Sequence, residues 1–420
     1  MSSLSLTAQL PRVAYFPDSF HEVNGVAHTS RHFEAFARRR NLPFLCVRAG
    51  ERSPALRREG NVWTLELPRG VLSFALEKDL SFDPAYARHI PAIGDVLEEF
   101  APTLVHITGP SELGMLGAAV AAQHGLPLAA SWHTNVHEYL ARRSEWLFKL
   151  LPGEQPRTAS RMVEEWTLAA TAQLYARAQV LFAPSEALCE QLTGLTGRPC
   201  HRMPRGVDTS LFTPARRRRQ SEAFTLGFVG RLSVEKNVAL LAAIHDQLHA
   251  AGLRDIRFVV VGQGSEEAML RERMPDSEFA GVLRGEALAA AYAAMDLFVF
   301  PSHTDTFGNV VLEALASGVP TVVTPDGGPA TIVREAARVV GGPVGCIAPD
   351  AEFAAAVEAL VEGPERLAVM RANARRFALT ATWDAVFEGV YEGYGDALRG
   401  EAGNRVEAMP VSEATARLSA

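Results

Sequence analysis

The segment Phe300-Pro-Ser-His-Thr-Asp-Thr-Phe-Gly-Asn-Val-Val-Leu-Glu-Ala-Leu-Ala-Ser-Gly-Val-Pro320 decides the fold. Its first residue closes a short apolar run that is typical of a buried strand. A polar loop follows, and a helical pattern begins near Asn309 and stops at Gly318. Strand, loop and helix in this order are part of a βαβ unit. The segment therefore predicts an α/β protein with parallel sheets.

The same alternation extends through the chain on both sides of this segment. Further strand-like runs lie at residues 13–17, 44–47, 104–108, 128–133 and 180–184, and again at 225–229, 257–261, 279–283, 297–300 and 321–324. Residues 61–68 alternate like a half-exposed strand. Doubly wound sheets bind ligands beyond the carboxyl ends of their strands, so we expect two Rossmann-like domains that face an interdomain cleft.

The length of 420 residues also favours two hydrophobic cores. Pro204-Arg205-Gly206, which precedes a polar stretch, marks the expected boundary. We assign residues 1–204 to an N-terminal domain and 205–381 to a C-terminal domain. An amphipathic helix is predicted at 382–398, and the composition of 399–420 predicts a disordered tail.

Charge and cysteine usage exclude several classes of protein. The net charge is −7, and residues 1–200 contribute about −1 of it, so neither half has the basic balance of a nucleic-acid-binding protein. The four cysteines form no CxxC pair and have no histidine at zinc-finger spacing, which indicates neither a disulfide framework nor a metal site. The N-terminus lacks signal-peptide features, and we expect a cytoplasmic protein without a bound cofactor.

The loop and helix that follow residue 300 carry the first chemical signal. Gly308 allows close backbone approach, and the first amides of the helix are unpaired, which suits an anionic or polyhydroxylated ligand. Asp305 and Glu313 could accept hydrogen bonds from vicinal sugar hydroxyls. Alternatively, Asp305 stabilises a turn and Glu313 interacts with the helix dipole, and the spacing does not decide between these interpretations.

Two further segments add candidate residues. Arg231 and Lys236 lie in a loop ahead of a helix, where two cations could stabilise a departing diphosphate without a metal; the chain contains no Asp-x-Asp pair. They could equally be solvated charges. His133 lies at the end of a strand in the first half, where a lone histidine is more often structural than catalytic, and His106 and His137 are competing histidines. Gly25 could let backbone amides approach a phosphate.

Together these segments closely resemble the retaining glycosyltransferases of family 4, which have the GT-B fold. The match covers nearly the whole chain, and its pieces are Asn24-Gly25-Val26, Trp132-His133-Thr134, Pro204-Arg205-Gly206-Val207-Asp208, Gly230-Arg231-Leu232, Glu235-Lys236-Asn237, Val261-Gly262-Gln263-Gly264 and Asp305 through Glu313. The greatest likeness is to bacterial GDP-mannose-dependent α-mannosyltransferases and to sulfoquinovosyltransferases. Asp305 departs from the family pattern, which has glutamate there.

The resemblance implies metal-independent transfer of a mannose-like or glucose-like hexose from a GDP- or UDP-linked donor to a lipid or glycan acceptor. Arg231 and Lys236 would bind the diphosphate, Glu313 the ribose, and Asp305 the sugar. His133 would lie beside the sugar, and the last helix would pack on the first domain. The other donor-binding residues that it implies are Asn24, Gly25, Val282, Leu283, Thr306, Phe307, Gly308, Asn309 and Val310.

Other enzyme and binding classes fit less well. Val261-Gly-Gln-Gly resembles a dinucleotide fingerprint, but Glu267 occupies its third glycine position, which argues against a dehydrogenase. A sugar-nucleotide epimerase and a non-catalytic two-lobed sugar-binding protein stay as alternatives. Residues 142–151 combine apolar and basic side chains, which predicts either peripheral contact with the inner face of a membrane or an ordinary core helix.

Overall fold

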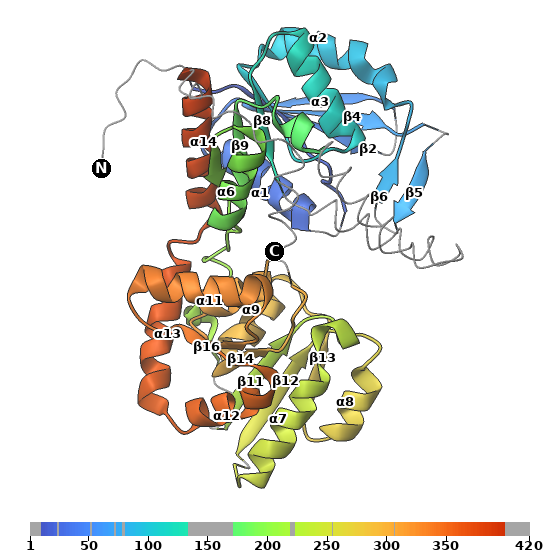
Figure 1. Ribbon diagram of the computed structural model, residues 1–420. Helices are drawn as coiled ribbons and strands as arrows, with labels where there is room; N and C mark the ends of the chain where they lie inside the picture. Colours follow the sequence, from blue (N-terminus) through green and yellow to red (C-terminus); the bar gives the residue numbers. More distant parts are fainter. Residues whose placement is uncertain are drawn as a thin grey trace, which may run out of the picture. The chain divides into compact units, whose positions relative to one another are not determined.

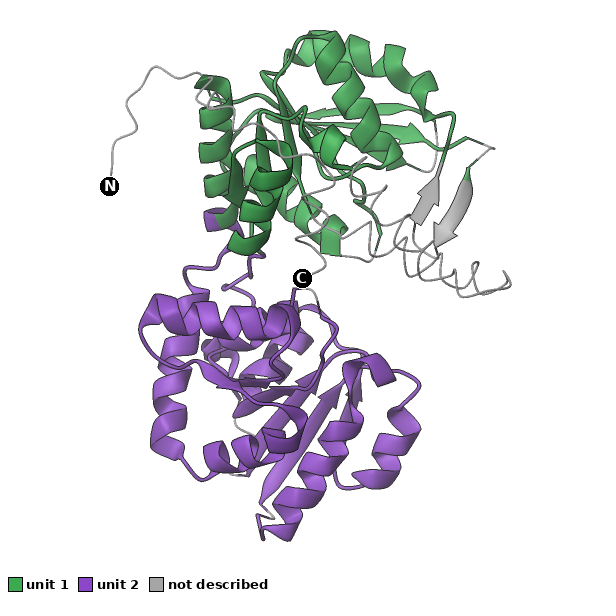
Figure 2. Cartoon of the chain, in the orientation of Figure 1, with its two compact units in different colours: residues 1–204, 386–420 green, residues 205–385 purple. Residues whose placement is uncertain are grey.

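The computed structural model describes residues 10–22, 25–50, 53–70, 73–77, 80–132, 171–218, 223–253, 255–305 and 307–399. The chain forms two compact units. Unit 1 consists of residues 1–204 and 386–420, and unit 2 of residues 205–385 (Figure 2). Among the described residues, no helix combines the length and the apolar character needed to cross a bilayer.

Unit 1 is built on an eight-stranded sheet with the order β10-β9-β8-β7-β1-β2-β4-β3. Only β3 runs antiparallel to its neighbour. The strands are Val13–Phe16 (β1), Phe44–Gly50 (β2), Ala55–Glu59 (β3), Val62–Pro68 (β4), Leu104–Ile107 (β7), Leu128–Ser131 (β8), Val180–Ala183 (β9) and Cys200–Arg202 (β10), with a separate hairpin of Phe74–Glu77 (β5) and Leu80–Phe82 (β6). The helices are Gly25–Arg39 (α1), Ile90–Phe100 (α2), Glu112–Gln123 (α3) and Glu186–Thr196 (α6), with a short η1 at Tyr86–His89.

Unit 2 has a six-stranded, all-parallel sheet with the order β13-β12-β11-β14-β15-β16. Counted from the first strand of the unit, this is the 3-2-1-4-5-6 order of a Rossmann fold. The strands are Phe224–Val229 (β11), Ile256–Val261 (β12), Glu278–Gly281 (β13), Leu297–Phe300 (β14), Thr321–Val323 (β15) and Gly345–Ile347 (β16). The helices are Ala239–Ala250 (α7), Glu267–Arg273 (α8), Gly285–Ala294 (α9), Asn309–Ala316 (α10), Gly327–Val340 (α11), Asp350–Val361 (α12) and Pro364–Ala378 (α13), with short turns at Pro214–Arg216 (η2) and Val234–Lys236 (η3).

The central strands of both sheets are buried because helices cover the two faces of each sheet (Figure 1). All four residues of β14 are buried, for example, as expected for a central parallel strand. The two predicted doubly wound domains are therefore present. The sequence did not predict β3, whose residues 57–59 are exposed. It also did not predict β10 and β16, which are three residues long.

The last helix, Trp383–Arg399 (α14), joins unit 1 from Val386 onward. Its Phe387 ring stacks on Phe33 of α1, with centroids 4.4 Å apart. Its Tyr394 hydroxyl is hydrogen-bonded to His106 Nδ1 in β7. Apolar stacking and a buried polar contact thus hold this helix against the first sheet.

Candidate functional site

The polar loops predicted from the sequence meet at one edge of the unit 2 sheet. Strand β11 pairs with β14 on one side and with β12 on the other, so the strand order reverses between β11 and β14. Loops that leave such a switch point diverge and make room for a ligand. The loop after β11 contains Arg231 and Lys236, and the loop after β14 contains Asp305.

An ion pair joins the two loops. Lys236 Nζ lies 2.6 Å from Asp305 Oδ2, and the two side chains are 17% and 24% exposed. The Thr304 hydroxyl also donates to the Glu235 carbonyl over 3.1 Å. An ion pair with this limited exposure is screened less than a surface pair. The structure therefore brings together a cation and a carboxylate that are 69 positions apart in the chain.

The start of α10 offers polar groups beside this pair. Gly308 precedes the helix with φ +70° and supplies no side-chain cap, and a Cβ there would lie 3.0 Å from the Pro329 nitrogen. Asn309 Oδ1 is buried and has no hydrogen-bond partner among the described residues. The Asp305 carbonyl accepts a 2.8 Å hydrogen bond from Gly328 N–H, which fixes the loop. The first amides of a helix generally lack intrahelical partners, and together with the unpartnered Asn309 oxygen they are suited to a polar ligand.

Glu313 follows one turn later on the same helix. Burial raises the pKa of its carboxyl to about 7, and the neighbouring Tyr292 hydroxyl lowers it in part. Tyr292 is itself fully buried on α9. A carboxyl group with a strongly raised pKa near a ligand edge is a recurrent feature of functional sites, although buried structural carboxyls also show it.

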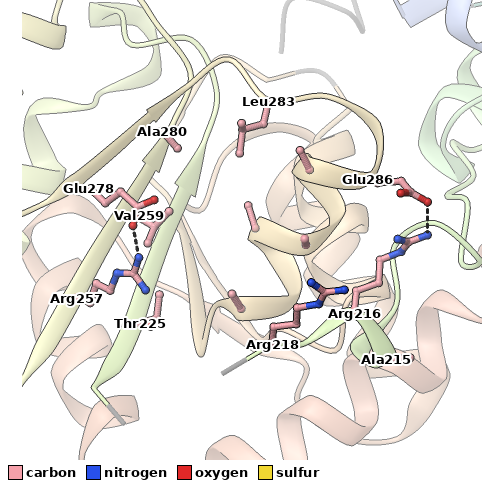
Figure 3. A pocket seen from close by; sticks show the side chains of 14 residues that line it. Ala215, Arg216, Arg218, Thr225, Arg257, Val259, Glu278, Ala280, Leu283 and Glu286 are labelled. Atoms are coloured by element: carbon pink, nitrogen blue, oxygen red, sulfur yellow. Dashed lines mark hydrogen bonds and ion pairs between the residues drawn. The ribbon is translucent and has the colours of Figure 1, made fainter. Parts of the chain in front are cut away.

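Arg231, Val282 and Leu283 lie in more open surroundings. The Arg231 side chain is 71% exposed and pairs with Glu235 over 3.3 Å. Val282 is 51% exposed just beyond β13. Leu283 lines a pocket between β11–β13 and α9 (Figure 3). Leu283 is the one lining residue that the sequence analysis assigned to donor binding. Neither Lys236 nor Asp305 lines this pocket, so it is distinct from the Lys236–Asp305 edge.

Two residues near this edge were not assigned a role from the sequence. His303 Nδ1 lies 2.7 Å from Asp326 and its Nε2 lies 3.0 Å from Asp350. Hydrogen bonding to Asp326, followed by that to Asp350, raises the His303 pKa. The Arg205 guanidinium lies 4.3 Å from the centre of the Phe307 ring. Both residues support the loop that carries Asp305. His303 belongs to the segment 300–320 and Arg205 to the motif 204–208, but no sequence signal indicates these contacts.

The corresponding edge of unit 1 carries different groups. Gly25 begins α1, directly after the loop that follows β1. Asp18 lies in that loop, accepts a hydrogen bond from the Ser111 hydroxyl, and has a pKa raised to about 6 by burial. His106 is completely buried and contacts Ser131 over 3.0 Å, and burial lowers its pKa to about 3. His106 is therefore a neutral core residue.

Several predicted residues lie outside the described part of the chain. These are Asn24, His133, Thr306 and residues 142–151. Their predicted roles in donor binding, catalysis and membrane contact stay predictions.

Comparison with known proteins yields matches over most of the chain. Residues 23–211 match the model of Glycosyltransferase Family 4, and residues 223–363 match that of Glycosyl transferases group 1. A GDP-mannose-dependent alpha-mannosyltransferase of Mycolicibacterium smegmatis is 34% identical over 70% of this chain and 74% of its own length. A sulfoquinovosyl transferase of Arabidopsis thaliana is 30% identical over 58% of this chain and 47% of its own length.

Solved structures give the same fold. Sucrose-phosphate synthase from Thermosynechococcus elongatus superposes with a TM-score of 0.64 at 17% identity, over 92% of this chain and 99% of that one. The Anabaena protein HepE, solved with UDP and glucose, gives 0.58 at 15% identity, over 92% and 99%. These likenesses establish the GT-B fold.

Proposed function

Because this chain belongs to glycosyltransferase family 4, we propose that it transfers a mannosyl residue from GDP-mannose to a hydroxyl group of a lipid or glycan acceptor, with retention of configuration and without a metal ion. The relatives support the donor, since three of them are named GDP-mannose-dependent alpha-mannosyltransferases. The likeness to a sulfoquinovosyl transferase supports a glycolipid product as one alternative.

The Lys236–Asp305 pair is the observation that carries this proposal. When Lys236 binds the donor diphosphate, this lysine would exchange Asp305 for the diphosphate as its anionic partner. Its ammonium group would therefore never be left desolvated and unpaired. Asp305, once released from the lysine, would accept hydrogen bonds from sugar hydroxyls. Glu313 would bind the ribose in its ionised form, and Asn309 the sugar or a phosphate through its polar side chain.

The proposed reaction exchanges one bond at the anomeric carbon for another on the same face. The bond from this carbon to the β-phosphate oxygen breaks and its electron pair stays on the phosphate. The acceptor oxygen forms the new bond, and its proton passes to the departing phosphate. Lys236 and Arg231 would stabilise the negative charge that develops on the diphosphate. The sequence supports a metal-free mechanism, because these cations are present and an Asp-x-Asp pair is absent.

The test is a panel of GDP-mannose, UDP-glucose and ADP-glucose, each assayed with membrane lipid extract as acceptor in EDTA and analysed for the anomeric configuration of the product. We expect an α-mannosylated lipid with GDP-mannose only. A reaction that requires added manganese would contradict the metal-free mechanism. Interconversion of free nucleotide sugars without acceptor would instead identify an epimerase, and the failure of GDP-mannose to raise the Tm would contradict the choice of donor.

A further inference from the structure

A group of metal-ligand side chains lies on unit 2, away from the Lys236–Asp305 edge. His245 and His249 occupy successive turns of α7, and Asp276 lies in the turn between α8 and β13. One ligand atom from each of the three residues lies within 4.8 Å of the others. From this convergence, we propose that His245, His249 and Asp276 form a zinc-binding site.

The spacing of the ligand atoms fits a tetrahedral ion. His245 Nε2 lies 3.2 Å from Asp276 Oδ1, and His249 Nε2 lies 3.8 Å from Asp276 Oδ2. Two ligand atoms at about 2.05 Å from a tetrahedral zinc ion are roughly 3.3 Å apart. Because these two distances end on different Asp276 oxygens, zinc binding would require side-chain rotations that bring one atom of each residue, already within 4.8 Å of the others, into the first coordination shell. A fourth position would remain for water.

The hydrogen-bond pattern also points to a cation. His245 is 6% exposed, and its Nδ1 atom is without a hydrogen-bond partner among the described residues, as is the buried Nε2 atom of His249. His245 Nδ1 lies 3.7 Å from Asp246 Oδ1, where a proton on Nδ1 would face a carboxylate. Without an ion, His245 Nε2 is hydrogen-bonded to Asp276 Oδ1 over 3.2 Å. With the proton on Nδ1 instead, the Nε2 lone pair would be available to an ion. A zinc ion would satisfy this lone pair, the Asp276 oxygen and His249 Nε2 together.

The ligand types favour zinc over magnesium or calcium. Two imidazole nitrogens and one carboxylate suit zinc and its transition-metal neighbours, whereas magnesium and calcium prefer oxygen ligands alone. The two imidazole rings are stacked with centroids 4.2 Å apart, which places both nitrogens on the same side of α7. Sequence spacing alone does not reveal the site, because the third ligand lies beyond two further elements, β12 and α8.

The proposed zinc site is separate from the Lys236–Asp305 edge. Helix α7 runs back along the sheet after β11, so its last two turns lie at the amino ends of the strands, and Asp276 precedes β13 at the same end. Lys236 and Asp305 follow the carboxyl ends of β11 and β14. Zinc would thus link α7 to the α8–β13 turn and stabilise unit 2 without taking part in sugar transfer.

The experiment titrates zinc into the full chain, without an affinity tag, in competition with a chromophoric zinc indicator, and measures Tm in parallel. The variants are His249→Gln and Asp276→Asn, whose side chains are 32% and 60% exposed and so tolerate exchange. The control is His32→Gln, which disrupts the His28–His32 pair of α1, another histidine pair at i and i+4 but without a clustered carboxylate among the residues that the structure describes.

We expect one zinc ion per chain and a rise in Tm of about 5 °C at saturation. Each ligand variant should weaken zinc binding about 100-fold, because loss of a ligand should cost at least as much as loss of a residue that hydrogen-bonds to a ligand. His32→Gln should bind like the wild type. EDTA should remove the Tm gain but leave the rate of sugar transfer unchanged, which separates this proposal from the proposed function. Wild-type zinc affinity in His249→Gln and Asp276→Asn, or no zinc binding by the wild type, would overturn it.

Discussion

The six strands β4-β2-β1-β7-β8-β9 of the unit 1 sheet have the same order as the unit 2 sheet, but the two sheets carry different chemistry at their switch points. In unit 2, β11 and β14 are followed by the partly exposed Lys236–Asp305 pair. In unit 1, β1 and β7 are followed by Asp18 and Ser111, which are hydrogen-bonded to each other, and the Asp18 N–H donates to Thr108 over 2.7 Å. The same topology therefore presents a cation at one edge and an acidic, hydrogen-bonded loop at the other.

The difference shows what the Rossmann topology determines and what it leaves to the loops. Topology places both loops beyond the carboxyl ends of the strands. The side chains on those loops then select the ligand: a lysine suits a diphosphate, whereas Asp18, with a pKa raised to about 6, would repel one when ionised. We therefore expect nucleotide binding to depend on unit 2 and to tolerate changes at Ser111.

The largest effect should follow from removal of the unit 2 cation. Lys236→Ala should lower kcat/KM for GDP-mannose by roughly 10²- to 10³-fold, because the departing diphosphate loses a charged contact. Lys236→Arg, which keeps the charge, should lose less. Ser111→Ala should leave the Kd for GDP unchanged. Similar losses of GDP affinity in Ser111→Ala and Lys236→Ala would remove the distinction between the two edges.

Arg231 allows a matched test within unit 2. Arg231 and Arg271 are both more than half exposed, and each pairs with a glutamate at i,i+4 spacing. Surface pairs of this type contribute little to stability, so neither Arg→Ala change should move Tm by more than about 2 °C. Arg231→Ala should nevertheless lower turnover by roughly 100-fold, while Arg271→Ala should stay within about twofold of wild type. Equal activities would identify Arg231 as an ordinary surface charge.

Glu313→Gln should change the pH dependence of stability. The folded-state pKa of about 7 lies above the ordinary 4.5, so the folded chain holds an extra proton between these values. Stability should therefore fall as pH rises from about 4.5 to above 7. At pH 8 the variant should be more stable than wild type by on the order of 2 kcal/mol, and at pH 4 the two should be alike. Urea unfolding at both pH values measures this, and a difference that is independent of pH would argue against a buried ionisable carboxyl.

The sequence predicts the repeating architecture well, because fully buried parallel strands leave strong apolar runs such as residues 297–300. It predicts β3 poorly, since an exposed edge strand such as Ala55–Glu59 lacks that signal. The Lys236 and Asp305 loops are recognisable from their polar composition and from family resemblance. Their direct contact is not, because it depends on the adjacency of β11 and β14, which is a property of the tertiary fold.

The contacts of His303 show the same limit. Its partners Asp326 and Asp350 belong to separate βα units, so no local pattern links them. Arg205 is similar. It begins unit 2, yet its guanidinium stacks on Phe307 in the loop that carries Asp305. Such long-range contacts support the candidate site without contributing to its motif, and only the folded structure reveals them.

The smallest expected effect concerns His303, which pairs with two carboxylates at the unit 2 edge. Hydrogen bonds to Asp326 and Asp350 raise its folded-state pKa above the ordinary 6.5. Its charged form therefore stabilises the fold fully below pH 6.5, and this contribution is lost as pH rises through the raised value. The side chain is 38% exposed, so screening limits this gain in folding stability to about 0.5–1 kcal/mol.

His303→Gln should lower Tm by about 1–4 °C at pH 5.5 and by much less at pH 9. His124→Gln, at an exposed position after α3, is the control and should show neither change. An equal loss of Tm at both pH values would mean that His303 acts through packing and not through its charge.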